Sequence, residues 1–339
     1  MSNYRVIAVD AMGGDFGPKV ILPAAIMALK KNKDLQVILV GQESVLKRYL
    51  KKLKPNFGER LLMQNASEVV EMDELPSQAL RGKKDSSMRV SINLVKEGKA
   101  QACVSAGNTG ALMATARFVL KTLPGIDRPA IMYAFPNRNG LTHMLDLGAN
   151  VDCSAEHLLQ FAIMGSVLTE AVFDMPEPKV GLLNVGTEEI KGNEQVKEAA
   201  QLISESKALN YIGYVEGDDI MLGDVDVVVC DGFVGNVALK SMEGLAKMTK
   251  SFMMQAIKHN LFTRVCAVFA YPVLKLFKEF VNTERYNGAS LVGLNGIVVK
   301  SHGGAKVVGL YHAIEEALHE VEKDVPQKIC QKLQLILDK

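Results

Sequence analysis

The chain has 339 residues, of which 48% are hydrophobic and 23% are charged, a composition typical of globular proteins that excludes a largely disordered chain. The formal net charge of +1 at pH 7 provides no overall positive field, so we expect no nucleic-acid partner. The five widely spaced cysteines include no CxxC pair, which predicts neither a zinc site nor a disulfide framework and favours a reducing cytoplasm.

The N-terminal stretch MSNYRVIAVDAMGG leads directly into a strand-like run and lacks the apolar core of a signal peptide. No segment reaches the roughly 18 uncharged apolar residues that a membrane-spanning helix needs. The nearest segment, residues 265–274, is too short. The sequence therefore predicts a protein that stays on the cytoplasmic side.

Short runs rich in valine and isoleucine alternate with longer segments of helical periodicity. This alternation is typical of a mostly parallel open sheet with helices on both faces, and it predicts an α/β fold. Strands are predicted at residues 6–9, 36–40, 102–105, 130–134, 141–145, 179–183, 211–215, 225–230 and 297–300. Helices are predicted at residues 18–31, 86–97, 109–121, 154–171, 194–206 and 305–321.

We expect one large α/β unit over residues 1–339, with a bilobed form left open. Right-handed crossovers should place successive strands side by side, with the loops after their carboxyl ends along one edge. In an open α/β sheet that edge lines the ligand crevice. Six of the predicted strands are followed by small, polar, glycine-rich loops. The candidate binding residues in these loops are Asp10, Gly13, Gly14, Asp15, Gly107, Asn108, Thr109, Gly110, Asn184, Gly186, Thr187, Glu188, Asp231, Gly232, Phe233, Gly235, Asn236, His302 and Gly303.

The stretch VSAGNTGALMATAR, residues 104–117, changes from a strand to a helix within one turn. Its glycines permit a close backbone approach, and the start of the helix presents unpaired N–H groups, which usually bind an anion. None of the loops matches a P-loop or gives a convincing G-x-G-x-x-G pattern after a strand. The loops therefore suit a small oxyanion better than a nucleotide, although glycines also serve backbone geometry alone.

A basic segment, LRGKKDSSMRVSINLV, supplies positive charge at residues 80–95. Cations just before a helix N-terminus form a focused anion site, whereas a solvated face is the alternative. Ser86 fits an N-cap of the helix that follows. Lys191 and Lys240, which follow other loops, either add to the site or lie on the surface. The candidate residues of the basic segment are Arg81, Lys84, Asp85, Ser86 and Ser87.

No nucleophile stands out, because Ser105, Cys153 and Cys230 lack a recognisable elbow motif. His302, in the Ser-His-Gly-Gly loop, is the one histidine that we consider for acid–base chemistry. Paired acidic residues occur, but the spacing that binds hard metal ions is absent, so we predict no metal site.

Residues 250–282 have apolar side chains at helical spacing, flanked by lysine and arginine. Pro272 should divide this segment into two helices and so form a protruding amphipathic hairpin. A dimer interface or a core helix is one interpretation, and peripheral contact with anionic lipids is the other. The candidate membrane-contact residues are Leu261, Phe262, Val265, Val268 and Phe269.

With these motifs in view, the chain resembles the bacterial phosphate acyltransferases of phospholipid synthesis. The resemblance runs nearly from end to end and includes AVDAMGGDFGP (residues 8–18), RGKKDSSM (81–88), SAGNTGALMA (105–114) and LDLGAN (145–150). It continues through GLLNVGTEEIKGNE (181–194), YVEGDDI (214–220), VVVCDGFVGNVALK (227–240) and LVGLNGIVVKSHGGA (291–305).

The resemblance implies transfer of a fatty acyl group from acyl-acyl carrier protein to inorganic phosphate, without a metal or nucleotide cofactor. It implies a fold similar to isopropylmalate dehydrogenases and phosphotransacetylases, and a homodimer. It also implies a peripheral location at the inner face of the cell membrane, where a glycerol-3-phosphate acyltransferase would use the acyl phosphate.

Phosphate is already ionised at neutral pH and can attack a thioester itself, so the protein need only position it and stabilise the carbonyl oxygen. We expect the amides of residues 108–110 and Lys84 to hold phosphate, with Ser86 or Ser87 orienting it. Asn184 and Asn236 are candidates for the carbonyl oxygen, and Lys191 and His302 for protonating the departing thiolate.

Two other classes remain open. One is a related enzyme, either an acyl-CoA phosphotransacetylase or an oxidoreductase like isopropylmalate dehydrogenase. The other is a lipid- or anion-binding regulator without turnover. The acyl-chain preference is not predicted by the sequence.

Overall fold

The computed structural model describes residues 4–280 and 283–337 of the chain. In these residues, eleven strands form one sheet. They are β1 (Arg5–Asp10), β2 (Leu35–Gly41), β3 (Leu61–Asn65), β4 (Ala102–Ser105), β5 (Ala130–Pro136), β6 (Leu141–Leu145), β7 (Lys179–Leu183), β8 (Asn210–Val215), β9 (Val227–Val229), β10 (Ala289–Val292) and β11 (Ile297–Lys300). Their order across the sheet is β3-β2-β1-β4-β11-β10-β5-β6-β9-β7-β8.

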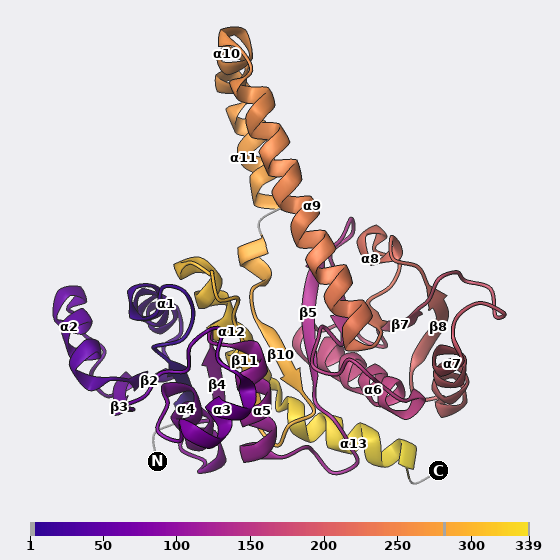
Figure 1. The fold of residues 1–339 in the computed structure, drawn as a ribbon, viewed down its shortest axis with the longest axis horizontal. Coiled ribbons are helices and arrows are strands. Elements are labelled where there is room, and N and C mark those ends of the chain that lie inside the picture. The colour runs from indigo at the N-terminus through magenta and orange to yellow at the C-terminus, as the bar shows by residue number, and fades with distance from the viewer. Residues whose placement is uncertain (1–3, 281–282, 338–339) are drawn as a thin grey trace.

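The α-helices alternate with these strands and cover both faces of the sheet (Figure 1). They are α1 (Pro18–Lys31), α2 (Glu43–Leu53), α3 (Pro76–Gly82), α4 (Ser87–Lys96), α5 (Thr109–Leu120), α6 (Ala155–Val172), α7 (Glu194–Ser206), α8 (Asp219–Leu222), α9 (Gly232–Lys258), α10 (Leu261–Phe269), α11 (Tyr271–Phe280), α12 (Val307–Lys323) and α13 (Val325–Leu337). Short 3₁₀ turns lie at Gly58–Arg60 and Thr283–Tyr286.

Seven of the ten strand pairs are parallel, which confirms the predicted mostly parallel sheet. The expectation that successive strands lie side by side is wrong at the centre. There, β10 and β11 lie between β4 and β5 because the chain returns to the middle of the sheet near its end. Strand β10 is antiparallel to both of its neighbours, and β5 is antiparallel to β6.

These antiparallel pairs reverse the strand direction between the two halves of the sheet. Strands β1, β4 and β11 are adjacent and parallel, so their carboxyl ends meet at one edge. Strands β6, β9 and β7 are parallel to each other but run in the opposite sense. The six glycine-rich loops therefore do not share one edge, contrary to the sequence-based expectation.

The side chains of β1 and β4 alternate between two layers of core, as a pleated strand requires. Ile7 and Val104 face a cluster covered by α1 and α12, whereas Ala8 and Cys103 face the layer under α4 and α5. Beyond β10, separate clusters form under α6, α7 and α13 and around the base of α9. We call the half on β3, β2, β1, β4 and β11 the first lobe, and the half on β5, β6, β9, β7 and β8 the second lobe (Figure 1).

Helices α9, α10 and α11 form a hairpin that projects from the body of the protein (Figure 1). Pro272 lies at the start of α11, as expected, but a further break before α10 gives three helices instead of two. Asn260 causes that break. Its side chain accepts a hydrogen bond from the Thr263 amide at 2.8 Å, and its own amide donates to the Thr263 hydroxyl at 3.1 Å, which starts a new helix.

The hairpin is not part of the core, so the core-helix interpretation is wrong. No residue of α10 is buried, and Leu261, Phe262 and Phe269 expose 77%, 75% and 82% of their surface. Residues 281 and 282 of the predicted hairpin segment lie outside the described residues. Within residues 4–280 and 283–337, every helix is too short or too polar to cross a membrane.

Candidate functional site

Three glycine-rich loops of the first lobe contact one another at the carboxyl ends of β1, β4 and β11. We call residues 10–15, 105–110 and 301–304 the first-lobe rim. The Asp15 amide donates to the Gly303 carbonyl at 3.0 Å, and the Ser301 amide donates to the Ser105 carbonyl at 2.9 Å. A Cβ on Gly13 would lie 2.7 Å from the Gly107 nitrogen, so the backbones approach as closely as glycine permits.

Asp10 and Ser105 form the buried floor of the rim. The Ser105 hydroxyl donates to Asp10 Oδ2 at 2.6 Å, and the Gly107 amide donates to the Ser105 hydroxyl at 3.1 Å. Both side chains are 1% exposed, and burial raises the pKa of Asp10. The Ser105 hydroxyl both donates and accepts within the rim and is buried, so it joins the loops to the floor.

Lys300, the last residue of β11, is also buried at the rim. It is paired in register with Ser105 and contacts the carbonyl oxygens of Ala106, at 3.5 Å, and Ser301. Burial lowers the pKa of Lys300 to about 8. The nearby carboxylates of Asp10 and Asp15 oppose this shift, and the charge of Lys240 from the second lobe adds to it.

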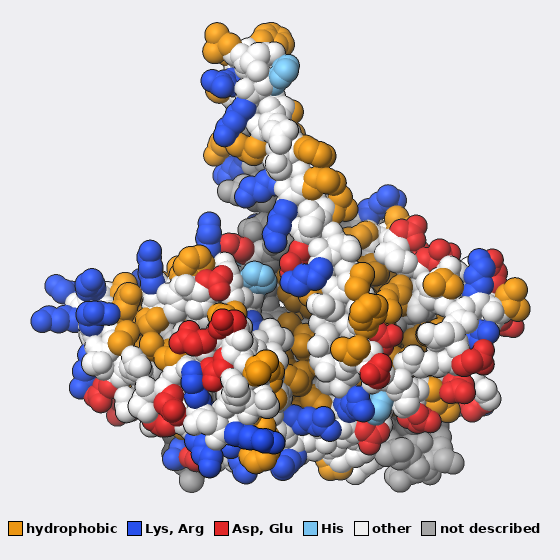
Figure 2. All heavy atoms as spheres, in the orientation of Figure 1, with side chains coloured by type: hydrophobic (Ala, Val, Ile, Leu, Met, Phe, Trp, Pro, Cys, Tyr) orange, Lys and Arg blue, Asp and Glu red, His pale blue; other side chains and the backbone are white. Residues whose placement is uncertain are grey.

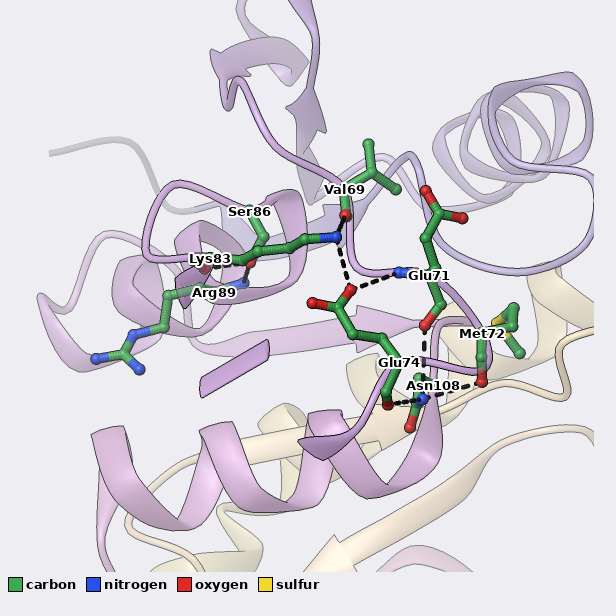
Figure 3. Close-up of polar contacts among 8 residues, drawn as sticks. All are labelled: Val69, Glu71, Met72, Glu74, Lys83, Ser86, Arg89 and Asn108. Atoms are coloured by element: carbon green, nitrogen blue, oxygen red, sulfur yellow. Dashed lines mark hydrogen bonds and ion pairs between the residues drawn. The ribbon is translucent and has the colours of Figure 1, made fainter. Parts of the chain in front are cut away.

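The GNTG loop ends in a helix start, as predicted, with Asn108 as the N-cap of α5. Asn108 Oδ1 accepts from the Ala111 amide at 3.0 Å, while its Nδ2 donates to the carbonyls of Met72 and Glu74, each at 2.9 Å (Figure 3). Asn108 therefore fixes the loop by its side chain. The amides of Thr109 and Gly110 have no hydrogen-bond acceptor in the described part of the chain and remain open for a ligand.

The basic segment contributes less charge than the sequence suggests. Lys83 Nζ lies 2.6 Å from Glu74 Oε2 and 2.5 Å from the Val69 carbonyl, so this cation is paired (Figure 3). Arg81 and Lys84 are exposed and form no ion pair among the described residues.

The polar residues after these cations have structural partners. Ser86 is the N-cap of α4, as expected, and accepts from the Arg89 amide at 3.3 Å. The buried Ser87 stabilises the carboxylate of Asp10. Asp85 Oδ2 accepts from the amide and hydroxyl of Ser67, at 2.8 and 2.6 Å. Neither Ser86 nor Asp85 is free to orient a ligand by its side chain in this conformation.

His302 is exposed at the outer side of the rim, and the backbone holds it there. Its amide donates to Asn287 Oδ1 at 3.0 Å, while Asn287 Nδ2 donates to the buried Ser301 hydroxyl at 2.7 Å. The Gly304 amide donates to His302 Nδ1 at 3.0 Å, and Nε2 has no hydrogen-bond partner in the described part of the chain. This arrangement allows His302 to exchange a proton with a molecule at the rim.

The second lobe contributes the start of α9. Asp146 is fully buried and accepts from four donors in residues 131–150, so it shapes the LDLGAN loop, and burial raises its pKa. Gly232 donates its amide to the Asn150 carbonyl at 2.7 Å, and a Cβ on Gly235 would overlap the Asp146 carbonyl. These two glycines therefore let α9 pack directly on the loop.

Asp231 is the N-cap of α9, accepting from the Val234 amide at 2.8 Å. Asn236 and Lys240 are exposed further along this helix, and Lys240 pairs with Glu243 at 3.1 Å. Phe233 is 63% exposed beside Cys153 and Gln195.

Met113 of α5 packs against the cluster that includes Ala238 of α9, so the two helices lie on the same face of the central strands. Figure 2 shows a hollow between the lobes on this face, below the base of the hairpin.

Residues 184–191 form a separate loop after β7, which we call the second-lobe loop. Asn184 Nδ2 donates to the Lys191 carbonyl at 3.2 Å, and Lys191 Nζ lies 3.1 Å from Glu188 Oε2. Gly186 is buried beneath these side chains, and Thr187 is exposed. This loop forms hydrogen bonds within itself, and among the described residues no hydrogen bond or ion pair joins it to the first-lobe rim.

The cysteines are poor nucleophiles in these positions. Cys103 and Cys230 are buried, and burial raises the pKa of each thiol well above its usual value. Burial raises the pKa of Cys153 to about 11, and Cys266 is exposed on the hairpin far along the chain from the rim. A thiolate at neutral pH is therefore not available at the rim.

Lys300 and Asp146 were not among the residues predicted for the site from the sequence, and Ser105 was considered only as a weak nucleophile candidate. Each of these residues ends or directly follows a buried apolar strand. Asp10 ends such a strand too and was predicted because glycines follow it. A polar residue at the last position of an apolar strand, or directly after it, is thus the signal that finds all four.

A cavity of about 250 Å³ lies elsewhere, between α6 and α12. It is lined by Met132, Leu168 and Phe173 and by the buried His143, whose pKa is lowered to about 4 by burial. The lining also includes Arg285, Glu315 and Glu316, and the two carboxyl groups offset the charge of the one guanidinium. The first-lobe rim, with its open amides and Lys300, is therefore the better anion site.

Residues 5–328 match the family described as fatty acid synthesis protein. The phosphate acyltransferase of Methylococcus capsulatus is 61% identical over 96% of this chain and 96% of its own length. The phosphate acyltransferase of Legionella pneumophila (strain Paris) is 60% identical over 94% of this chain and 93% of its own length.

Solved structures share the fold. A phosphotransacetylase from Streptococcus pyogenes gives a TM-score of 0.64 at 20% identity and covers 94% of both chains. The EutD phosphotransacetylase from Staphylococcus aureus gives a TM-score of 0.62 at 18% identity, covering 94% of this chain and 95% of its own. These likenesses confirm the predicted α/β fold class.

Proposed function

The chain belongs to the bacterial phosphate acyltransferase family, and from this premise we propose that it transfers a fatty acyl group from acyl-acyl carrier protein to inorganic phosphate. A phosphate oxygen attacks the thioester carbonyl carbon, the carbon–sulfur bond breaks, and the carrier leaves as its thiolate. The product is an acyl phosphate for phosphatidic acid and phospholipid synthesis. No enzyme side chain becomes acylated.

The observation that carries this proposal is the pair of open amides at the start of α5. Thr109 and Gly110 present N–H groups at the exposed end of a helix whose N-terminal dipole favours an anion. The same rim has no available thiolate, and its two buried serines are engaged, Ser105 with Asp10 and Ser301 with Asn287. Direct attack by phosphate needs positioned donors and no protein nucleophile, which is the chemistry that these residues offer.

The remaining roles follow from exposure and position. His302 Nε2 donates a proton to the departing thiolate, because it faces solvent at the rim. Asn236, exposed near the start of α9, stabilises the carbonyl oxygen as its charge develops. Losing one such donor typically lowers the rate by about 100- to 1,000-fold. Arg81 and Lys84 add a positive field that attracts the anion.

The decisive experiment mixes the protein with acyl-acyl carrier protein and inorganic phosphate and traps acyl phosphate as a hydroxamate with hydroxylamine. We expect product that depends on both substrates and no acylated protein by intact mass. A covalent acyl adduct on Cys153, Ser105 or another side chain would contradict direct attack. Phosphate binding without any product would favour the anion-binding regulator.

Two further reactions distinguish this activity from those of the related enzymes. Acyl-CoA in place of acyl-acyl carrier protein tests a phosphotransacetylase, and NAD with a hydroxy acid tests an oxidoreductase. We expect the carrier-bound substrate to be preferred and no reduction of NAD.

We further propose that the hairpin of α9, α10 and α11 contacts the inner face of the cell membrane. Its end presents Leu261, Phe262, Val265, Val268 and Phe269, all at least 48% exposed. Figure 2 shows this apolar end with lysine and arginine side chains below it, an arrangement that suits an interface with anionic lipids. Acyl phosphate is amphiphilic, so release beside the bilayer would deliver it to a membrane glycerol-3-phosphate acyltransferase.

Sedimentation with vesicles tests this contact. The variants Leu261→Asp and Phe269→Asp should abolish binding to vesicles that contain phosphatidylglycerol, because a buried carboxylate at the interface is unfavourable. Ile190→Asp, at a position 84% exposed in the second-lobe loop, is the matched control and should bind like the unaltered protein. Retained binding by the hairpin variants would contradict the proposal.

We also propose that the protein acts as a homodimer, which sedimentation equilibrium will test. If the hairpin is the dimer interface, Leu261→Asp will produce monomers, whereas under the membrane proposal the dimer persists in solution. The same pair of variants therefore separates the two interpretations of the apolar surface.

A further inference from the structure

We propose that Lys300 is a phosphate-binding residue, which reaches the anion from the floor of the first-lobe rim. This inference rests on the proposed function. It assigns the anion's main charge partner to a strand residue that the sequence motifs did not indicate, in place of the exposed Lys84.

Lys300 lies among the loops of the first-lobe rim. Lys300 ends β11, beside Ser105 of β4 and next to the Ser301–Gly304 segment. Its ammonium contacts the carbonyls of Ala106 and Ser301, which lie in two of the three loops of the rim. The open amides of Thr109 and Gly110 follow Ala106 by only a few residues, so the cation and the amides belong to the same loop cluster.

The charge of Lys300 lacks a direct counterion. The side chain is 7% exposed, and burying an ammonium is unfavourable unless it is paired. Among the described residues, no carboxylate lies within ion-pair distance of it, and two carbonyl oxygens accept from its three N–H bonds. One N–H group of Lys300 therefore has no acceptor, and its positive charge is not neutralised by a carboxylate. Both are available to an anion.

The other candidate cations are less suited to this role. Lys84 is exposed to solvent, where an ion pair contributes little. Lys240 of α9 is also exposed, and it already pairs with Glu243 at 3.1 Å.

The test measures binding of inorganic phosphate by calorimetry, without an acyl donor, so that it does not depend on turnover. Lys300→Met keeps the length and packing of the side chain and removes its charge. We expect the dissociation constant for phosphate to rise about 10-fold or more, since a hydrogen bond to a charged group is lost. The KM for phosphate in the hydroxylamine-trapping assay should rise to the same extent. Lys306→Met, at an exposed lysine six residues later, should change both by less than about 2-fold.

A pH profile separates a binding role from a structural one. Sulfate is used as the probe because its charge is constant over this range. In the unaltered protein its affinity should fall as the pH rises through about 8, where Lys300 loses its proton. Lys300→Arg should retain binding and move this loss to much higher pH, because arginine stays protonated. The other charged groups that face Lys300 are Asp10 and Asp15 of the rim and Lys240 of α9, and His302 follows in the same loop.

Normal phosphate binding by a folded Lys300→Met variant would overturn the inference. So would a loss of sulfate affinity near pH 8 that persists in Lys300→Arg, which also decides the matter if the methionine variant does not fold. The failure of the proposed function has a different result: phosphate binds and responds to Lys300, but no acyl phosphate forms from acyl-acyl carrier protein.

Discussion

The first-lobe rim and the second-lobe loop look alike in sequence but differ in structure. Both follow a buried strand and both combine glycine, asparagine, threonine and lysine nearby. The loops of the rim bond to one another around Asp10, whereas the second-lobe loop bonds to itself through Asn184, Glu188 and Lys191. Strand β7 is adjacent and parallel to β9 and β8, as β1 is to β4, so strand position alone does not explain the difference. The glycines do, because Gly13 and Gly14 lie directly against the other two loops of the rim, whereas a Cβ on Gly186 would meet only side chains of its own loop.

The largest expected effect compares a glycine from each region. In Gly13→Ala the new Cβ would lie 2.7 Å from Asp10 Oδ2 and from the Gly107 nitrogen, so backbone must move. We expect a loss of about 3 kcal/mol in the free energy of unfolding, together with loss of activity. In Gly186→Ala the nearest atoms are Lys191 Cδ at 2.5 Å and Glu188 Oε2 at 2.8 Å, which belong to flexible exposed side chains. Urea denaturation of both variants measures the difference, and we expect less than about 0.5 kcal/mol for Gly186→Ala.

Equal destabilisation by these two substitutions would break the comparison, because it would mean that the second-lobe loop is as tightly packed as the rim. The activity of Gly186→Ala is a second check. It should stay near that of the unaltered protein if the loop takes no part in the reaction.

A smaller effect, on phosphate binding, is expected when the first backbone N–H group of the helix that follows each region is removed. Thr109 is the first residue of α5, where proline fits and removes one N–H group without breaking the helix. Asn108 before it has φ −55° and ψ 122°, outside the helical region that a following proline disfavours. Thr109→Pro should weaken phosphate binding about 10-fold, the effect of one lost hydrogen bond to an anion, and leave the melting temperature nearly unchanged.

Glu194→Pro is the matched control, since Glu194 is the first residue of α7 and Asn193 before it is extended. It should not alter phosphate binding. If both proline variants weaken binding equally, the anion does not lie at α5, and the second-lobe loop regains the role that the sequence suggested for Asn184 and Lys191.

The sequence predicted the elements of the fold well because most strands here are continuous apolar runs with polar ends. Strands 102–105, 141–145 and 179–183 were predicted at their observed bounds. Strand β3 was missed because it lies at the sheet edge with four of its five residues exposed, and it therefore lacks an apolar pattern. The order of strands was not predictable, since the return of β10 and β11 to the centre depends on long-range pairing that leaves no local signal.

The candidate site was predicted in part, for a similar reason. Glycine spacing identified the residues around Asp10 and Gly107, because close backbone contact demands glycine whatever the neighbours are. The sequence could not show which loops meet, so it grouped Asn184 and Lys191 with the rim. It also could not show that Lys300 is buried, because a lysine at the end of a strand usually lies in solvent.

The smallest expected effect compares one lysine–glutamate pair from beside the rim with one from the second-lobe loop. Lys83 and Glu74 are partly buried, with 28% and 14% of their side-chain surface exposed, whereas Lys191 and Glu188 expose 45% and 59%. Lys83→Met should lower the free energy of unfolding by about 1 kcal/mol, because it breaks a short pair and a bond to the Val69 carbonyl. Lys191→Met should leave stability unchanged within error, as exposed pairs usually do.

The pH dependence of these two variants gives the sharper criterion. The hydrogen bond from Lys83 lowers the pKa of Glu74, so the pair stabilises the fold above pH 4.5, the usual value for glutamate, and this contribution is lost as the pH falls below it. The gap between Lys83→Met and the unaltered protein should therefore narrow at low pH, while the Lys191→Met curve follows the unaltered protein throughout. Thermal melts from pH 3 to 7 would measure both curves. A gap that keeps its full size in acid would mean that the hydrogen bond from Lys83 to the Val69 carbonyl, rather than the pairing with Glu74, stabilises the segment that Asn108 binds.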